Sequence, residues 1–415
     1  MKVLHISYSD GIGGAARAAT RIHHACLKYL IVSHMLVKEK VSCFSTIEEI
    51  SEQISLIGKI TNRIKTKILW KVLNKQKPDA ISKLYSLAAL PLSYLVKRIN
   101  TSDADLCNLH WVCADFLSIE SIRSITKPLV WTLHDMWAFC GAEHYAENEE
   151  WQNGYSSRSF WDLDRWVWTR KKKAWTRPMF IVTPSDWLAD CVKKSALMGS
   201  WQIRTIPYPL DIQVFQPREK LWCRETLGLP KDKKLILFGA ISPTADRRKG
   251  WDLLQLALQK LSQTADGVVG VIFGQSEPPD PPKLGLPLHW MGYLHDDITL
   301  SLLYSAVDVM VVPSRQDNLP QTSTEPQACG TPVVAFDVCG LPSAVEHKQT
   351  GYLAKPFDID ELAHGISWVL SDQERWQKLS SQARERAVRL WSPEVVAKQY
   401  LEVYEEAIAM GKQVK

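Results

Sequence analysis

The sequence of 415 residues predicts an α/β protein with two domains, each built around one doubly wound parallel sheet. Three observations support this fold class. The chain is longer than a single compact domain, which usually has about 100–200 residues. Short runs of β-branched residues alternate with longer amphipathic segments, as in parallel sheets whose strands are joined by helices. A segment with two prolines, 207–211, separates two sets of such runs and is the best candidate linker.

Each half of the chain contains about six strand candidates, enough for one sheet. In the first half they are Val3–Tyr8, Ile31–Val37, Asp105–His110, Leu129–Leu133, Met179–Thr183 and Gln202–Pro207. In the second half they are Lys234–Phe238, Val268–Phe273, Leu288–Met291, Val307–Val312, Pro332–Phe336 and Gly351–Ala354. A helix is predicted over 393–409, because apolar residues recur there three to five positions apart.

Composition excludes several classes of protein. Apolar residues make up 46% of the chain and charged residues 23%, which is typical of a globular protein and not of a disordered or collagen-like chain. An uncharged stretch at 84–96 is shorter than the roughly 20 residues of a membrane-spanning helix. The short apolar run at 3–6 is followed by no cleavage pattern, so we expect a first strand and not a signal peptide. Nine scattered cysteines without a C-x-x-C pair indicate a reduced, cytoplasmic protein without zinc.

Positive charge is concentrated in the first half, where residues 1–210 hold 28 Lys and Arg against 19 Asp and Glu. Segment 56–77 contributes seven basic and no acidic residues, and its apolar residues recur three or four positions apart. This pattern predicts a helix that is apolar on one side and cationic elsewhere. The helix either packs on its own domain or docks on anionic lipid. A basic run at 170–173 lies among tryptophans, but no DNA- or RNA-binding motif accompanies it, so we expect no nucleic-acid partner.

A glycine-rich turn follows the first strand candidate. It reads Asp-Gly-Ile-Gly-Gly-Ala-Ala-Arg over 10–17, and its Gly13 and Gly14 precede a predicted helix. Glycines let the backbone approach a ligand closely, and the free N–H groups at a helix start bind anions. The turn is not G-x-G-x-x-G and no G-K-[ST] follows it. A tight turn without a ligand therefore explains it about as well.

Two carboxylates, Asp317 and Glu325, stand eight positions apart in the second half. A strand candidate precedes them and another follows, so they lie at the carboxyl end of a strand, where open α/β sheets bind their ligands. We expect backbone N–H groups around 318–320 to hold phosphate and Glu325 to accept hydrogen bonds from a ribose. Glu325 also suits the start of a helix, where a carboxylate stabilises the helix dipole.

Five further short motifs occur along the chain. They are His110-Trp111, Thr132-Leu133-His134-Asp135, Thr183-Pro184-Ser185, Arg247-Arg248-Lys249-Gly250 and Ala328-Cys329-Gly330-Thr331-Pro332-Val333-Val334. With the glycine-rich turn and the carboxylate pair, they make the chain resemble the family 4 retaining glycosyltransferases, which use nucleotide sugars and have the GT-B fold. The resemblance spans nearly the whole length, and within the family it is closest to bacterial enzymes of exopolysaccharide or lipopolysaccharide assembly.

The resemblance implies a GT-B fold, in which two Rossmann-like doubly wound domains face a central cleft. Residues 1–207 would then form the acceptor-binding domain and residues 208–390 the domain that binds the nucleotide sugar. Residues 391–415 would form a C-terminal helix that crosses back to the first domain.

The resemblance also implies roles for residues around the donor. Gly13 and Gly14 would approach the donor diphosphate. Arg248 and Lys249 would neutralise the diphosphate as it leaves, because fixed cations stabilise the charge that develops there. His134 would lie beside the donor sugar near the anomeric carbon. The structural alternatives are a buried, hydrogen-bonded His134 and a solvated basic turn at Lys249.

In the carboxylate segment, sugar hydroxyls and phosphate would be held by Asp317 and by the backbone of Asn318, Leu319 and Pro320. Glu325 would bind the ribose. The chain departs from the family pattern here. An aspartate stands where most members have glutamate, and Asn-Leu-Pro replaces Gly-Phe-Gly, so Pro320 removes one backbone donor. Some relatives have a cysteine cluster that looks metal-binding, but in this chain only Cys140 remains of it. We therefore expect no metal, and we expect no cofactor.

The sequence thus predicts a hexosyltransferase that transfers a sugar from a nucleotide diphosphate sugar to a hydroxyl with retention at the anomeric carbon. The departing phosphate would take the acceptor's proton. The expected acceptor is a lipid-linked or polysaccharide glycan of cell-surface polysaccharide assembly. We expect a cytoplasmic protein whose segment 56–77 contacts the inner face of the membrane. Two alternatives stay open: a non-catalytic scaffold that binds sugar nucleotides, and a sugar-nucleotide epimerase.

Overall fold

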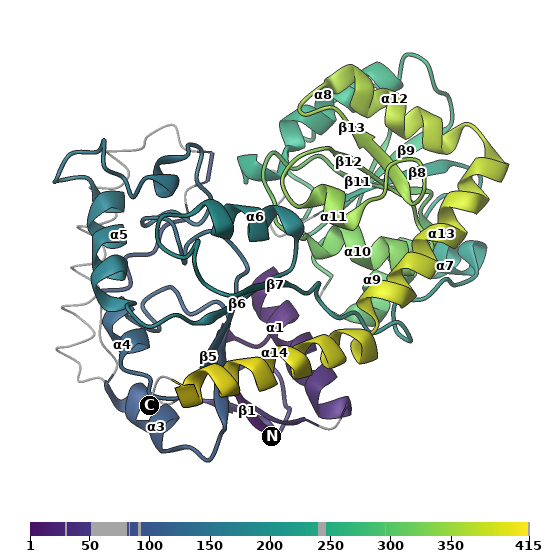
Figure 1. Cartoon of the computed structure of the whole chain (residues 1–415). Coiled ribbons are helices and arrows are strands. Elements are labelled where there is room, and N and C mark those ends of the chain that lie inside the picture. Colours follow the sequence, from purple (N-terminus) through teal and green to yellow (C-terminus); the bar gives the residue numbers. More distant parts are fainter. Residues whose placement is uncertain are drawn as a thin grey trace. The chain divides into compact units, whose positions relative to one another are not determined.

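The computed structural model divides into two compact units (Figure 1). The first consists of Met1–Ile206 with Ala397–Lys415, and the second of Pro207–Val396. The residues that the structure describes are 1–29, 31–50, 81–82, 84–89, 93–239, 246–294 and 296–413. Segment 56–77, for which the sequence predicts a cationic amphipathic helix, lies outside them.

The first unit is built on a parallel sheet of seven strands in the order β3-β2-β1-β4-β5-β6-β7. Its strands are β1 (Lys2–Ser9), β2 (Val32–Glu39), β3 (Ile47–Glu49), β4 (Leu106–Leu109), β5 (Leu129–Thr132), β6 (Phe180–Thr183) and β7 (Ile203–Thr205). The helical segments are α1 (Gly14–Lys28), α3 (Ser93–Thr101), α4 (Ile119–Arg123), η1 (Glu150–Gln152), α5 (Leu163–Ala174), α6 (Asp186–Lys194) and, from Ala397 onward, α14 (Pro393–Gln413). The six strands expected in this half are all present. β3 was not expected, because it has three residues and only Ile47 among them is buried.

The second unit is built on a parallel sheet of six strands in the order β10-β9-β8-β11-β12-β13. They are β8 (Lys234–Gly239), β9 (Val268–Phe273), β10 (Leu288–Trp290), β11 (Val309–Val312), β12 (Val333–Phe336) and β13 (Gly351–Ala354), and all six were expected. The helical segments are α7 (Lys220–Thr226), η2 (Arg247–Lys249), α8 (Trp251–Leu261), α9 (Asp297–Ala306), α10 (Gln321–Ala328), α11 (Leu341–Ala344), α12 (Ile359–Leu370) and α13 (Gln373–Trp391). Two Rossmann-like sheets thus confirm the predicted fold class.

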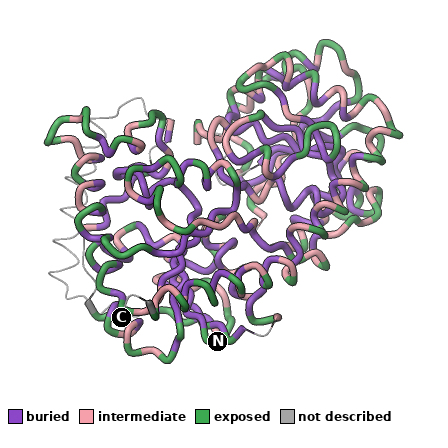
Figure 2. The backbone as a smooth tube through the Cα atoms, viewed as in Figure 1, coloured by how far each residue is buried: buried purple, intermediate pink, exposed green. Residues whose placement is uncertain are grey.

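Burial explains why these segments become strands. Every residue of β9 and of β12 is buried, as expected for parallel strands that are covered on both faces (Figure 2). Most of the helices are amphipathic instead, and several begin at an aspartate that accepts a hydrogen bond from the first turn. Asp162 caps α5 and Asp372 caps α13 in this way.

The last helix, α14, packs on the sheet of the first unit through two tyrosines. Asn108 donates to the Tyr404 hydroxyl at 2.8 Å, and the Tyr400 hydroxyl lies 3.2 Å from that of Thr132. Both tyrosines are fully buried. The helix predicted over 393–409 is therefore present, and it stabilises β4 and β5 close to where these strands end. Within the described ranges, no helix combines the length and the apolar character that crossing a membrane requires.

Candidate active site

The glycine-rich turn lies between β1 and α1, at the carboxyl end of β1. Gly13 has a φ of 89°, which a residue with a side chain rarely adopts. No atom lies within 4 Å of the position of a β-carbon on Gly13 or Gly14, so the backbone here is open to a ligand. Asp10 closes the other side of the turn by accepting the N–H groups of Val41 and Ser42 at 2.7 and 3.0 Å.

Two adjacent pairs of residues meet where β4 and β5 end. His110 and Trp111 follow β4, and His134 and Asp135 follow β5 by one further residue. Because these strands are parallel neighbours, the pairs lie side by side. His110 Nδ1 is 3.2 Å from His134 Nε2, and Trp111 Nε1 donates to Asp135 Oδ2 at 3.0 Å. The predicted sugar-binding His134 is thus buried and hydrogen-bonded, and it lies at the carboxyl edge of the sheet.

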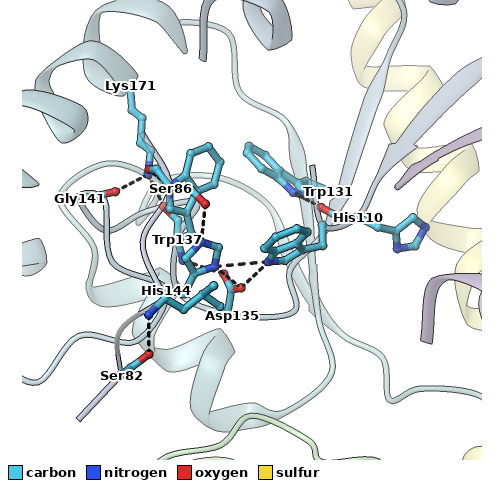
Figure 3. A network of polar contacts seen from close by, with 11 residues as sticks. Ser82, Ser86, His110, Trp131, Asp135, Trp137, Gly141, His144 and Lys171 are labelled. Atoms are coloured by element: carbon cyan, nitrogen blue, oxygen red, sulfur yellow. Dashed lines mark hydrogen bonds and ion pairs between the residues drawn. The ribbon is translucent and has the colours of Figure 1, made fainter. Parts of the chain in front are cut away.

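Asp135 is held by a polar network that sequence reasoning did not find (Figure 3). His144 Nδ1 donates to Asp135 Oδ2 at 2.6 Å, and His144 Nε2 lies 2.8 Å from the Ser86 hydroxyl. The backbone N–H of Trp137 donates to Asp135 Oδ1 at 2.9 Å. Burial alone would raise the pKa of Asp135, but His144 and the hydrogen bonds outweigh burial and lower it. Asp135 is therefore ionised, it accepts hydrogen bonds from Trp111, Trp137 and His144, and it lies next to His134.

Lys171 anchors the loop that contains this network. Its ammonium group donates to the carbonyl oxygens of Trp137, Cys140 and Gly141, the last two at 3.0 and 2.8 Å, and lies 3.8 Å from the centre of the Trp137 ring. Burial lowers the pKa of Lys171 to about 7. Lys171 belongs to the basic run at 170–173, and it is fully buried. Its spacing of four from the buried Val167 is the signal that would have identified it.

In the second unit, the basic turn η2 is pressed against the loop after β11. A β-carbon on Gly250 would lie 1.9 Å from the carbonyl oxygen of Pro313, so only glycine allows this approach. The backbone N–H of Arg315 donates to the carbonyl of Arg248 at 2.8 Å. The glycine of the Arg-Arg-Lys-Gly motif thus brings the cations of η2 to the carboxyl end of β11.

Asp317 is the centre of the charged cluster in the second unit. Lys249 Nζ lies 2.6 Å from Asp317 Oδ2, and an Arg248 guanidinium nitrogen lies 3.7 Å from Asp317 Oδ1. Arg248 also donates to the carbonyl of Gln316 at 3.2 Å and to Asp246 at 2.9 Å. Burial of Asp317 would raise its pKa, but Lys249 first and Arg248 second overcome that effect and lower it. The structure therefore brings together three of the predicted site residues as an ionised cluster.

The remaining predicted residues of this unit follow Asp317 directly. The N–H of Asn318 donates to the Asp317 side chain at 3.1 Å, Leu319 is 4% exposed, and Pro320 precedes α10. Glu325 lies within α10, and its Oε2 accepts the hydroxyl of Tyr304 at 2.9 Å. Tyr304 was not predicted, and a single aromatic residue in a helix gives no signal of such a role.

The described part of the chain contains no group of three or more His, Cys, Asp or Glu residues arranged to hold a metal ion. The expectation that no metal takes part stays a prediction. The chemistry that the described groups offer is hydrogen bonding by His134, charge stabilisation by Lys249 and Arg248, and anion approach at Gly13 and Gly14.

Comparison with known proteins finds a family match within the second unit. Residues 223–386 match the family described as glycosyl transferases group 1. A D-inositol 3-phosphate glycosyltransferase of Saccharomonospora viridis is 33% identical over 229 residues, which cover 50% of this chain and 51% of that protein. The chain thus spans about half the length of the curated relatives it matches.

Solved structures are similar over the whole chain. Sucrose-phosphate synthase from Thermosynechococcus elongatus superposes with a TM-score of 0.69 at 19% identity and covers 99% of both chains. Anabaena HepE, crystallised with UDP and glucose, gives 0.65 at 17% identity and covers 98% of this chain and 100% of its own. Residues 223–386 therefore resemble the glycosyl transferases group 1 family, and the chain that contains them has the GT-B fold.

Proposed function

We propose that this chain is a retaining glycosyltransferase that moves a hexosyl unit from a nucleotide diphosphate sugar to a hydroxyl group of an acceptor. The observation that carries the proposal is the cluster of Lys249, Arg248 and Asp317 at the carboxyl end of β11. The glycosyl transferases group 1 match supports it, because the matched residues include this cluster. HepE, a structural neighbour, was crystallised with UDP and glucose, which supports a nucleotide sugar as donor.

The two cations suit the difficult step of such a transfer. When the bond between the anomeric carbon and the diphosphate oxygen breaks, negative charge develops on the departing phosphate. The side chains of Lys249 and Arg248 are only 19% and 13% exposed, so water screens them weakly and their attraction for this charge is strong. Asp317 holds both in place before the donor arrives. We assign to them the binding of the leaving diphosphate, together with the open backbone at Gly13 and Gly14.

Retention follows if the acceptor attacks the face from which the diphosphate leaves. The new bond forms between the anomeric carbon and the acceptor oxygen, while the bond to the phosphate oxygen breaks and that oxygen takes the acceptor's proton. In this scheme His134 positions the sugar. Burial lowers the pKa of His134 to about 4, which makes it a weak base at neutral pH. Glu325, fixed by Tyr304, is assigned to the ribose.

For the acceptor we propose a lipid-linked or polysaccharide glycan of cell-surface polysaccharide assembly. The protein would act in the cytoplasm at the inner face of the membrane, and its basic segment 56–77 would contact anionic lipid. A mechanism without a metal or an organic cofactor is part of the same proposal.

The test is a donor panel with the purified full chain. Thermal shifts with UDP, GDP and ADP hexoses identify the donor first, because a ligand at 100 times its dissociation constant adds about 2.7 kcal/mol to the stability. Release of nucleotide that depends on an acceptor, with an unchanged anomeric configuration by NMR, is the expected result. Binding without release would indicate a scaffold, and an epimerised donor would indicate an epimerase. An inverted product would refute retention.

A further inference from the structure

Three imidazole rings form a hydrogen-bonded chain in the first unit, here called the imidazole chain. His5 Nδ1 lies 2.9 Å from His110 Nε2, and His110 Nδ1 lies 3.2 Å from His134 Nε2. His5 lies within β1, and the other two follow β4 and β5, which are the next strands of the sheet. Their exposed fractions are 0%, 2% and 8%. The imidazole chain thus runs from the interior to the edge where the candidate site lies.

Counting protons links the tautomers of the three rings. Burial lowers the pKa of His5 to about 3, that of His134 to about 4, and that of His110 well below its ordinary value, so all three are neutral at pH 7. A neutral imidazole has one N–H group and one bare nitrogen. His110 uses both nitrogens within the imidazole chain, so it donates to one neighbour and accepts from the other. The N–H groups therefore all point toward His134 or all point toward His5.

The inner end of the imidazole chain distinguishes these two arrangements. Nε2 of His5 is buried and has no hydrogen-bond partner among the residues that the structure describes. If the N–H groups pointed inward, His5 would carry its proton on this nitrogen and bury an N–H group without an acceptor. Folded proteins avoid such groups more strictly than bare acceptors. The outward arrangement leaves only a lone pair at this position.

We propose that His110 is a positioning residue that fixes the tautomer of His134, with the proton of His134 on Nδ1 and its bare Nε2 accepting from His110. His5 supports the arrangement by donating from Nδ1 to His110. Because the described hydrogen bonds end at His5, the imidazole chain orients protons and provides no onward path for them beyond that ring.

The tautomer decides what His134 can do for a ligand. Its consequence for catalysis rests on the proposed function, in which His134 contacts the donor sugar. With the proton on Nδ1, His134 is a hydrogen-bond donor on the side not engaged with His110, and it can orient a sugar hydroxyl. Such a nitrogen cannot take the proton of the acceptor, which is why the departing phosphate is assigned that task.

Nitrogen NMR of the unliganded full chain tests the proposal directly. Long-range proton–nitrogen spectra, recorded at pH 7.5 on protein labelled with ¹⁵N in its histidine rings, distinguish a protonated from a bare nitrogen. The peaks of His134 are identified by their loss in His134→Gln. We expect a protonated Nδ1 and a bare Nε2. A proton on Nε2 of His134 would overturn the proposal, whether or not the chain proves to be an enzyme.

Two variants of nearly equal size test the role of His110. His110→Asn places an amide N–H near the position of the imidazole Nδ1, whereas His110→Leu offers no donor. We expect the asparagine variant to keep the His134 tautomer and the leucine variant to lose it, with kcat about tenfold lower, the effect of one lost hydrogen bond. Identical spectra and rates in both variants would contradict the proposal.

These outcomes are separable from failure of the proposed function. The expected tautomer in a chain that turns over no sugar nucleotide would refute the glycosyltransferase assignment and leave the imidazole chain intact. If His110→Leu did not fold, the wild-type spectrum would still decide the tautomer.

Discussion

The first unit holds its candidate site residues as neutral rings, whereas the second unit holds them as paired ions. His134 is neutral because burial lowers its pKa, and it is held through His110. Asp317 is ionised although it is equally buried, because Lys249 and Arg248 lie beside it. Burial therefore leaves His134 neutral but does not neutralise Asp317. Both residues have a counter-charge nearby, since Asp135 raises the pKa of His134, but only the two cations beside Asp317 outweigh burial.

The contrast extends to composition, since seven of the eleven histidines lie in residues 1–206. Acid therefore acts on the two units at different pH values. Protonation of a buried imidazole costs folding free energy below its unfolded pKa of 6.5. Protonation of Asp317 matters only below its ordinary value of 3.8, because its pKa in the folded state is lower still.

The largest expected effect is loss of stability of the first unit between pH 6.5 and pH 5. In the folded state the pKa of His5 is about 3 and that of His134 about 4, against 6.5 when unfolded, so the unfolded chain binds more protons in this window. Their stabilising contribution is complete above pH 6.5 and decreases as the pH falls. At pH 5 each of the two histidines lowers the free energy of unfolding by about 2 kcal/mol, and together they lower it by about 4 kcal/mol. Native-state hydrogen exchange of the whole chain measures it in β1 and β5.

The sheet of the second unit is the internal control for that measurement. Its His347 also has a lowered pKa, but this residue is exposed and solvent screens its effect. We expect the amides of β8 and β11 to keep their protection from pH 6.5 to pH 5. Equal losses in both sheets would contradict the contrast between neutral and ionic sites.

The next largest effect is expected from Lys249→Met, which keeps the length of the side chain and removes its charge. The proposed transfer should slow by a factor of about 100–1,000, because the departing diphosphate loses a fixed cation. Nucleotide release in steady-state assays measures this, and the change should appear in kcat.

Lys260→Met is the matched control, because Lys260 is exposed and pairs with the exposed Asp360. Its rate should stay within a factor of two of the wild type, since isolated surface pairs contribute about 0–1 kcal/mol. A Lys249→Met enzyme as fast as this control would show that the cation at η2 does not stabilise the leaving group.

Most of the fold could be predicted from the sequence, because strands covered on both faces leave runs without polar side chains, such as 268–273 and 333–336. β3 was missed because a three-residue edge strand with one buried side chain leaves no pattern. Polar residues at strand ends, such as His134 and Asp317, were also found from the sequence, since that is where parallel sheets expose loops.

The pairing of site residues could not be predicted, because it depends on which strands become neighbours. Lys249 and Asp317 are 68 positions apart, and they meet because β8 pairs with β11. His5 lies within an apolar run, and nothing local indicates that its ring reaches His110. Such contacts are set by strand order, which spacing along the chain does not encode.

The two units also differ in the partners of a weakly exposed lysine. Lys249 pairs with a carboxylate, whereas Lys171 is surrounded by carbonyl oxygens. Lys171→Met should therefore lower the free energy of unfolding by about 2 kcal/mol, because buried carbonyl groups lose their donor. Urea unfolding measures the change. Lys173→Met on the exposed side of the same helix should stay within about 0.5 kcal/mol, and an equal effect of both would contradict the structural role of Lys171.

The smallest effect is expected from Trp111→Phe, which keeps a ring beside the site and removes one N–H group from Asp135. Asp135 retains His144 and the Trp137 N–H, so the carboxylate stays ionised and the loss should be about 1 kcal/mol of stability. The His134 tautomer should not change, because it depends on His110 and not on Asp135. The same nitrogen spectra measure the tautomer in this variant. A changed tautomer would show that the hydrogen bonds of Asp135 and of His134, at the ends of β4 and β5, are coupled and not independent.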